Sequence, residues 1–278
     1  MRPVLVTGGT GTLGRVVVAR LLDAGRDARV ASRRPGAATA VADLRSGAGV
    51  DEAVAGADAM VHCATTSGAA DVAVTRTLVD AARRADTPHL VFISIVGVDR
   101  IPLGYYRAKL AAERVIEDAG LGWTILRATQ FHDLVARLWR VQRRSPVIVS
   151  PAGTSIQPID VRDVAARLVE LATGPPAGRV PDLGGPEARD ARDLARAYLR
   201  ATGRRRAVVP VRFPGPVAAA YRRGHHLTVP QPGTTFEEFL AERPQARRRC
   251  LRWPRAGGAA RVRRLPHASE QAARRGVR

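Results

Sequence analysis

A short apolar run near the start of the chain leads directly into a glycine-rich turn. The run PVLVTG occupies residues 3–8, and the letters that follow it, GTGTLG, open a helical pattern. Gly9, Gly11 and Gly14 satisfy the spacing G-x-G-x-x-G. Counted from Gly8, the same stretch also satisfies G-x-x-G-x-x-G. Because such a turn between a strand and a helix places backbone N–H groups against a pyrophosphate, it predicts a dinucleotide-binding site.

Apolar runs and helical patterns alternate along the body of the chain. The further apolar runs lie at residues 28–33, 57–65, 89–97 and 123–128, and the clearest helical patterns lie at residues 12–25, 71–85 and 105–120. This alternation predicts a parallel sheet joined by right-handed crossovers, with helices on both faces. The expected fold class is α/β, with a doubly wound sheet.

The charge distribution separates the end of the chain from its body. The 278-residue chain has a net charge of +20, and residues 244–278 carry half of it, with 11 arginines and one acid. This stretch lacks sustained periodicity and is broken by Pro and Gly, so we expect a disordered basic tail. A nucleic-acid-binding arm is the alternative, but specific nucleic-acid binding is not expected in a chain rich in arginine throughout. Residues 1–243 are then expected to form one domain, in which residues 150–243 contribute a substrate-side region.

Other features restrict the setting of the protein. No apolar run approaches the roughly 20 residues of a membrane span, and no signal-peptide pattern precedes the first strand. Cys63 and Cys250 do not make a disulfide framework, and neither has metal-ligand spacing with a histidine. We therefore expect a cytoplasmic protein with a small-molecule substrate, away from membranes and without a metal. The oligomeric state is left open.

The end of the second apolar run favours one form of the cofactor. Sites for NAD place an Asp or Glu about 20 residues after the glycines to bind the ribose 2′-hydroxyl, whereas a 2′-phosphate needs positive charge. This chain has Ser32, Arg33 and Arg34 there, and no acid. Because the arginine side chain matches phosphate geometry, NADP(H) is expected in preference to NAD(H). The alternative is that Arg33 and Arg34 have no role in binding, because arginine is frequent throughout this chain.

The chain contains one lysine against 44 arginines. Lys109 lies four residues after Tyr105 in GYYRAKLAAE, so their side chains share one face of the expected helix. A nearby ammonium lowers the pKa of a tyrosine, which could then exchange a proton with a substrate oxygen while hydride moves at the adjacent carbon. The lysine could also hold the cofactor ribose. Tyr106 is three residues from the lysine, so the sequence leaves open which tyrosine acts.

Several stretches together resemble the atypical short-chain dehydrogenase/reductases, in their NmrA-like or NAD(P)H-binding branch. They read VLVTGGTGTLG, SRRP, HLVFISIVGVD, YYRAKLAAE, GWTILRATQFHD and IQPIDVRDVAARLVELA. The resemblance implies a Rossmann domain with a smaller substrate-side region. It also implies phosphate contacts at Thr10, Gly11, Thr12 and Leu13, a 2′-phosphate contact at Arg33, adenine contacts at Asp43 and Leu44, and positions near the rest of the cofactor for Ala64, Thr65, Ala128, Thr129 and Gln130.

The chain departs from this family where the family usually has a catalytic hydroxyl. Register against the usual Ser-Ser pair puts Ser94 one position early and Ile95 at the catalytic place, and the asparagine found in many relatives is absent because the chain has none. Ser94 is the expected third catalytic residue beside Tyr105 and Lys109, and Thr129 is the alternative.

The sequence therefore predicts an NADPH-dependent reductase of a small carbonyl, quinone or conjugated double bond. A redox-sensing NADP(H) binder of the NmrA type, without turnover, is the second interpretation, because the hydroxyl is displaced. A sugar-nucleotide epimerase or dehydratase uses the same fold, but its usual Ser or Thr and its longer spacing to the tyrosine are not in this chain.

Overall fold

The computed structural model describes residues 2–36, 38–66 and 68–242, so the tail predicted at residues 244–278 lies outside the described residues. Within these ranges the central sheet has seven strands in the order β3-β2-β1-β4-β5-β6-β9, and every neighbouring pair is parallel. The strands are β1 (Val4–Thr7), β2 (Ala28–Ser32), β3 (Thr39–Val41), β4 (Ala59–His62), β5 (His89–Ile95), β6 (Gly122–Ala128) and β9 (Gly178–Arg179). This arrangement confirms the predicted doubly wound Rossmann sheet.

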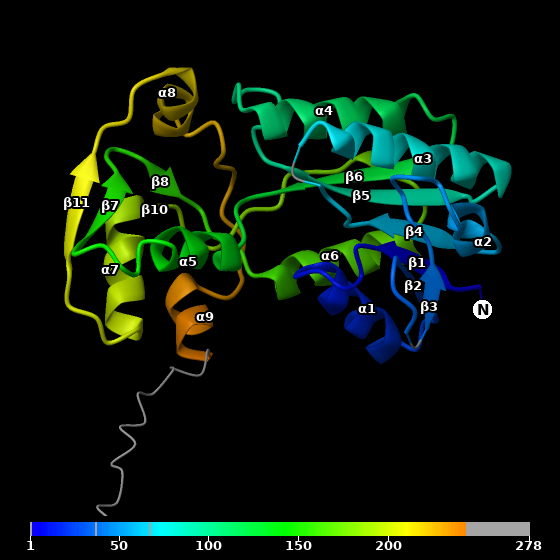
Figure 1. The fold of residues 1–278 in the computed structure, drawn as a ribbon, viewed down its shortest axis with the longest axis horizontal. Coiled ribbons are helices and arrows are strands. Elements are labelled where there is room, and N and C mark those ends of the chain that lie inside the picture. Colours follow the sequence, from blue (N-terminus) through cyan, green and yellow to red (C-terminus); the bar gives the residue numbers. More distant parts are fainter. Residues whose placement is uncertain (1, 37, 67, 243–278) are drawn as a thin grey trace, which may run out of the picture. The chain divides into compact units, whose positions relative to one another are not determined.

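Helices cover both faces of this sheet (Figure 1). One face carries α1 (Gly14–Asp23) and α6 (Val161–Thr173), which close one apolar core. The other face carries α2 (Val50–Val54), α3 (Ala70–Arg84) and α4 (Gly104–Glu117), which close a second core. None of the helices in the described part of the chain is long and apolar enough to cross a membrane.

Strand β5 shows why the central runs of the sequence are apolar almost throughout. Val91 and Ile93 contribute to the core beneath α1 and α6, while Leu90 and Phe92 contribute to the core beneath α3 and α4. Strands β1 and β4 are likewise buried at every residue. A parallel sheet covered on both faces needs apolar side chains on both sides of each strand, because neither side meets water.

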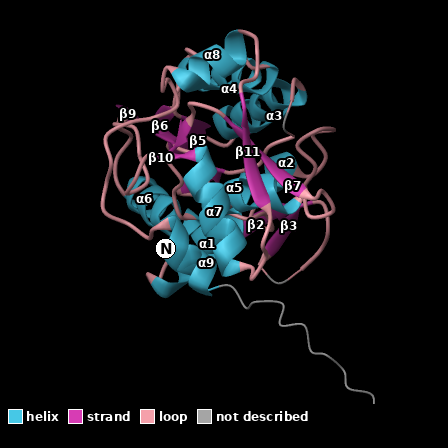
Figure 2. Ribbon diagram, turned by 90° about the vertical axis from the view of Figure 1, so that its left-hand side faces the viewer, coloured by secondary structure: helices cyan, strands magenta, loops and turns pink. Residues whose placement is uncertain are grey.

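The later part of the chain builds a further core of its own. Strands β7 (Val147–Pro151) and β11 (Ala207–Val211) pair in parallel, and α7 (Ala191–Ala201) packs against them (Figure 2). Trp139 from α5 and Phe239 from α9 belong to the same apolar cluster. The remaining elements are α5 (His132–Arg140), α9 (Phe236–Glu242), α8 (Pro216–Arg222) and the antiparallel pair of β8 (Ser155–Ile156) and β10 (Arg189–Asp190).

The expected substrate-side region, residues 150–243, is divided between these cores. Helix α6 and strand β9 return to the central sheet, while α7 and α9 belong to the core around Trp139. Helix α8 instead packs on the start of α4, where Val217 and Tyr221 contact the cluster that contains Tyr106. The region therefore contributes to more than one apolar core.

A buried ion pair attaches α4 to the sheet. The guanidinium of Arg127, on β6, donates to both carboxylate oxygens of Glu113 at 2.9 Å and 2.6 Å, and its third nitrogen donates to Asp99 at 3.1 Å. The side chains of Arg127 and Glu113 are 4% and 1% exposed. Two buried charges of this kind are tolerated because each satisfies the other through two parallel hydrogen bonds.

We expect Glu113→Ala to destabilise the protein by about 3–5 kcal/mol, because the change leaves the guanidinium of Arg127 buried without its main partner. Urea unfolding followed by circular dichroism measures the loss. Glu117→Ala, on the exposed side of the same helix, is the matched control and should change the free energy of unfolding by less than about 0.5 kcal/mol. Equal losses in the two variants would contradict this account.

Candidate cofactor and catalytic site

The glycines after β1 permit close backbone contacts that other residues would prevent. Gly8 has a φ of +67°, and a Cβ atom on it would lie 2.7 Å from the backbone nitrogen of Ala64. A Cβ on Gly14 would lie 2.2 Å from the carbonyl oxygen of Gly8, and one on Gly9 would lie 2.8 Å from the Val30 side chain. The turn is therefore packed against both β2 and the end of β4, and only glycine fits at these positions.

The first turn of α1 is suited to an anion. Leu13 precedes the helix and makes no capping hydrogen bond through its side chain, and the first turn contains no acidic residue. Thr10, Gly11 and Thr12 are exposed in front of it. Free backbone N–H groups and the positive end of the helix dipole together favour a phosphate group. The residues present thus fit the pyrophosphate of a dinucleotide.

At the predicted adenosine end the two arginines are exposed, while Ser32, Asp43 and Leu44 are half-buried. Ser32 ends β2, and its hydroxyl accepts a hydrogen bond from the backbone N–H of Arg34 at 3.1 Å. The side chains of Arg33 and Arg34 are exposed. Asp43 accepts a hydrogen bond from the backbone of Arg45 at 2.9 Å. Leu44 packs against the core beneath α3 and α4.

The predicted residues at the ends of β4 and β6 differ in how far their polar groups are engaged. The backbone N–H of Ala64 donates to the Thr7 hydroxyl at 3.3 Å, while Thr65 is exposed. Ala128 ends β6, and the buried hydroxyl of Thr129 accepts from the backbone N–H of Gly185 at 3.1 Å. Gln130 follows, next to the hydroxyl of Tyr106.

Tyr105 and Lys109 belong to one polar network. The Tyr105 hydroxyl lies 3.4 Å from the hydroxyl of Thr65, which donates to Asp71 at 2.7 Å. The ammonium of Lys109 lies 3.8 Å from the same carboxylate oxygen of Asp71 and 4.6 Å from the centre of the Phe92 ring. Lys109 is 4% exposed and Asp71 is 3% exposed. Asp71, in the first turn of α3, therefore joins α4 to the loop after β4.

Tyr106 lies in a different environment from its neighbour. It is buried, and its hydroxyl pairs with the hydroxyl of Tyr221, on α8, at 2.9 Å. Burial raises the pKa of Tyr106 far above its ordinary value, and the neighbouring Tyr221 raises it further. The geometry thus separates two tyrosines that the sequence leaves equivalent: Tyr105 faces the network around Lys109, and Tyr106 faces α8.

The expected effect of Lys109 on the pKa of Tyr105 is not found. Burial raises the pKa of Tyr105 most, a hydrogen bond from the Thr65 hydroxyl would lower it by less, and the charge of Asp71 raises it further. Burial lowers the pKa of Lys109, while the Asp71 carboxylate partly opposes that effect. The sequence argument was wrong here because it considered neither the burial of the tyrosine nor the carboxylate that lies beside the lysine.

A buried histidine connects this network to β1. Thr75 gives its hydroxyl proton to the backbone oxygen of Asp71 at 2.8 Å, so its contact with His62 Nε2 at 3.2 Å requires the histidine to donate. His62 Nδ1 then accepts from the Thr7 hydroxyl at 2.7 Å. Burial lowers the pKa of His62 to about 3 and raises that of Cys63 to about 12, so both groups are neutral near pH 7.

Ser94, the third predicted catalytic residue, is buried. Its hydroxyl has no hydrogen-bond partner among the residues that the structure describes. Ile95, at the usual catalytic place, packs with Tyr105 and Leu103 in the cluster beneath α8. An apolar side chain therefore occupies the place at which relatives carry a hydroxyl.

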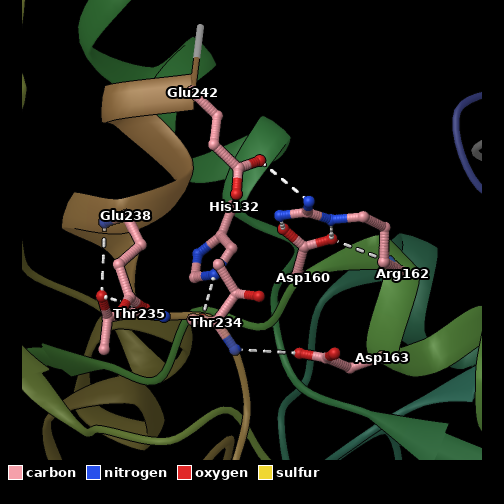
Figure 3. Close-up of polar contacts among 8 residues, drawn as sticks. All are labelled: His132, Asp160, Arg162, Asp163, Thr234, Thr235, Glu238 and Glu242. Carbon is pink, nitrogen blue, oxygen red and sulfur yellow. Dashed lines mark hydrogen bonds and ion pairs between the residues drawn. The ribbon is translucent and has the colours of Figure 1, made fainter.

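His132 is held in a structural role (Figure 3). Its Nε2 donates to the backbone oxygen of Thr234 at 2.9 Å, and its ring packs against Phe236 and Phe239. Nearby, Arg162 joins Asp160 at 2.9 Å and Glu242 at 2.8 Å. These contacts attach α9 to α5 and α6.

Sequence reasoning missed Asp71 as a site residue. An acidic residue in the first turn of a helix is usually explained by the helix dipole alone, so nothing in the local pattern distinguished it. Thr66 donates to Asp71 through both its backbone N–H and its hydroxyl. It lies in the loop after β4, where no local sequence pattern indicates such a role.

Comparisons with known proteins identify the family of this chain. A model of the NAD(P)H-binding family matches residues 8–175. A (4-alkanoyl-5-oxo-2,5-dihydrofuran-3-yl)methyl phosphate reductase of Streptomyces griseus is 31% identical over 242 residues, which cover 78% of this chain and 84% of that protein. An NAD(P)H azoreductase of Xenophilus azovorans is 28% identical over 224 residues, covering 76% of each chain.

A solved structure supports the fold. The NADPH-dependent quinone oxidoreductase of Escherichia coli, in complex with NADPH, superposes with a TM-score of 0.73 at 18% identity, covering 86% of this chain and 98% of that one. At this level of identity the match concerns the fold alone, and the family model and the reductase relatives carry the assignment. The chain therefore belongs to the NAD(P)H-binding family, and the two curated relatives named above are reductases.

Proposed function

We propose that the protein is an NADPH-dependent reductase of a small carbonyl, quinone or conjugated substrate, with Tyr105 as the proton donor and Lys109 as the residue that holds the cofactor ribose. The observation that supports it best is the Tyr105–Thr65–Asp71–Lys109 network. The network begins one residue after Ala64, which the glycine turn approaches closely. Tyr105 is thus expected to lie beside the nicotinamide end of the cofactor site.

The residues of the chain have separate tasks in this reaction. When bound, the cofactor supplies the hydride that the substrate carbon accepts. The first turn of α1 holds the pyrophosphate, and the Tyr105 hydroxyl gives its proton to the substrate oxygen. The 3.8 Å between Lys109 and Asp71 is too long for a hydrogen bond, so this ion pair leaves the ammonium donors of Lys109 available for ribose hydroxyls.

A second candidate function is a redox-sensing NADP(H) binder without turnover. The environment of the two hydroxyls considered for the third catalytic place favours this candidate. The Thr129 hydroxyl accepts a hydrogen bond from Gly185, and the Ser94 hydroxyl is buried beside Ile95. NADPH binding without oxidation of NADPH by any carbonyl or quinone would support this candidate over the reductase.

The proposed proton donor is tested with a panel of carbonyls and quinones, by following the oxidation of NADPH. Tyr105→Phe should lower kcat by about 10²–10⁴-fold, because the general acid is removed, while NADPH affinity is kept. Tyr106→Phe is the matched control and should keep kcat within a few-fold, because that hydroxyl is paired with Tyr221. If only the Tyr106 variant lost activity, the role of proton donor would pass to Tyr106.

Lys109→Arg should impair the protein although it keeps the charge. The buried pocket of Lys109 must then accept a larger, planar group, and overpacking of this kind costs about 1–3 kcal/mol. We expect NADPH affinity or kcat to fall about tenfold or more, measured by fluorescence titration and by turnover. Arg107→Lys, the reverse exchange on the exposed side of α4, is the control and should leave both quantities unchanged. Wild-type values for Lys109→Arg would remove Lys109 from the proposal.

The preference for NADPH is proposed to depend on Arg33. Arg33→Asp should narrow or reverse the preference, because a charge-assisted contact with the 2′-phosphate, worth about 1–3 kcal/mol, becomes a repulsion. Calorimetric titration with NADPH and NADH measures it. Arg83→Asp, at an exposed position at the end of α3, controls for the change in net charge. Equal affinity of the wild-type protein for the two cofactors would refute the preference.

A further inference from the structure

The carboxylate of Asp71 is the point at which the network around Tyr105 converges. It accepts from the hydroxyl of Thr65 at 2.7 Å, from the hydroxyl of Thr66 at 2.6 Å and from the backbone N–H of Thr66, and it faces Lys109 at 3.8 Å. Burial alone would raise the pKa of Asp71, but the hydrogen bonds from Thr66 and Thr65 outweigh burial and hold the pKa below its ordinary value. Asp71 is therefore an anion at neutral pH.

The direction of the hydrogen bonds determines what Thr65 can offer to Tyr105. A threonine hydroxyl has one proton, and a carboxylate only accepts. Since Thr65 gives its proton to Asp71 at 2.7 Å, its oxygen can only accept at the longer contact of 3.4 Å with Tyr105. While the Thr65 proton points to Asp71, the tyrosine hydroxyl faces lone pairs, which favour a phenol that donates over a phenolate. A Thr65 hydroxyl turned toward Tyr105 would instead lower the pKa of Tyr105.

The charges around Tyr105 lead to the same result. On α4, Tyr106 is in ring contact with Tyr105 and Lys109 follows one helical turn later, while α3 contributes the charge of Asp71. From α8, Tyr221 packs in the same cluster as a neutral phenol paired with Tyr106. On β4 and just after it, His62 and Cys63 are neutral near pH 7. The positive charge of Lys109 is thus opposed by a negative charge 3.8 Å away, and it is not free to stabilise a phenolate.

We propose that Asp71 is a positioning residue that keeps Tyr105 protonated: it orients the Thr65 hydroxyl away from the tyrosine and offsets the charge of Lys109, so that Tyr105 can donate a proton throughout the neutral and mildly alkaline range. This inference rests on the proposed function, in which Tyr105 is the proton donor of the reductase. It assigns to an acidic residue on α3 the control of the proton donor on α4.

The test compares the ionisation of Tyr105 in the wild-type protein and in Asp71→Asn, without substrate. The phenolate absorbance after a rapid pH jump is recorded for each protein, and the same measurement on a matching Tyr105→Phe variant is subtracted. The wild-type midpoint should lie above about 10, the ordinary value of tyrosine. Asp71→Asn should bring it below that value, by roughly one pH unit or more, because Lys109 is then unopposed. Asp80→Asn, on the exposed side of α3, should leave it unchanged.

The size of the shift distinguishes positioning from general loosening. If the substitution only loosened the packing, the midpoint would fall to the ordinary tyrosine value and no further, because solvent exposure by itself removes a shift without reversing it. The double variant Asp71→Asn, Lys109→Met should return the midpoint above about 10. A midpoint that stays unchanged in Asp71→Asn, or stops at the ordinary value, would overturn the inference.

The pH profile of turnover separates this inference from the proposed function. In the wild-type protein, reduction should stay at its plateau to above about pH 10, and in Asp71→Asn the alkaline limb should move down with the absorbance midpoint. A shifted midpoint without any NADPH oxidation would refute the reductase and leave the role of Asp71 supported. NADPH oxidation with an unshifted midpoint and an unshifted alkaline limb would refute the role of Asp71 and leave the reductase standing.

Discussion

The parallel direction of the central strands determines where most residues of the proposed cofactor site lie. In a parallel sheet all strands end at the same edge, so the segments that follow them gather there. The glycine turn follows β1, Ser32 ends β2, Thr65 follows β4 and Ala128 ends β6. Because β1 and β4 are neighbours, Gly8 can approach the backbone after β4 so closely that a Cβ atom would collide with it. The cofactor and the catalytic groups are therefore expected at one edge.

Helix α4 combines chemical and structural groups on one stripe. Tyr105, Lys109 and Glu113 follow one another at intervals of four residues, so they lie one above another on the helix. Lys109 and Glu113 are both buried, and buried charges need partners. Asp71 supplies the partner of the lysine and Arg127 that of the glutamate. The Asp71–Lys109 pair, beside the proposed proton donor, and the Arg127–Glu113 pair, which attaches the helix, thus lie on adjacent turns of one element.

The two ends of the site differ in their exposure to water, in agreement with the different tasks proposed for them. Arg33 and Arg34 are exposed, and a phosphate recognised by them can keep part of its hydration. Tyr105 is half-buried, and Val217 and Tyr221 of α8 pack in its cluster. Restricted solvent around a proton donor strengthens its electrostatic interactions and limits side reactions. Helix α8 thus belongs to the site although it comes late in the sequence.

The sequence by itself was sufficient for the fold class, the alternation of strands and helices and the position of the glycine turn. These features depend on local periodicity and on glycine spacing, and both can be read from one sequence without any tertiary contact. It also indicated Lys109 as a candidate, because a single lysine among 44 arginines makes that position unusual. The bounds of the predicted elements agree with those observed to within a few residues.

The tertiary structure alone brought Asp71 to Lys109, Tyr221 to Tyr106 and Arg127 to Glu113. The partners in the first two pairs are 38 and 115 residues apart, and no periodic pattern connects them. The same contacts reversed the expected shift in the pKa of Tyr105 and gave the two neighbouring tyrosines different surroundings. The physical reason is that a pKa depends on burial and on every charge within a few ångströms, and these follow from packing between elements and not from the sequence around the titrating residue.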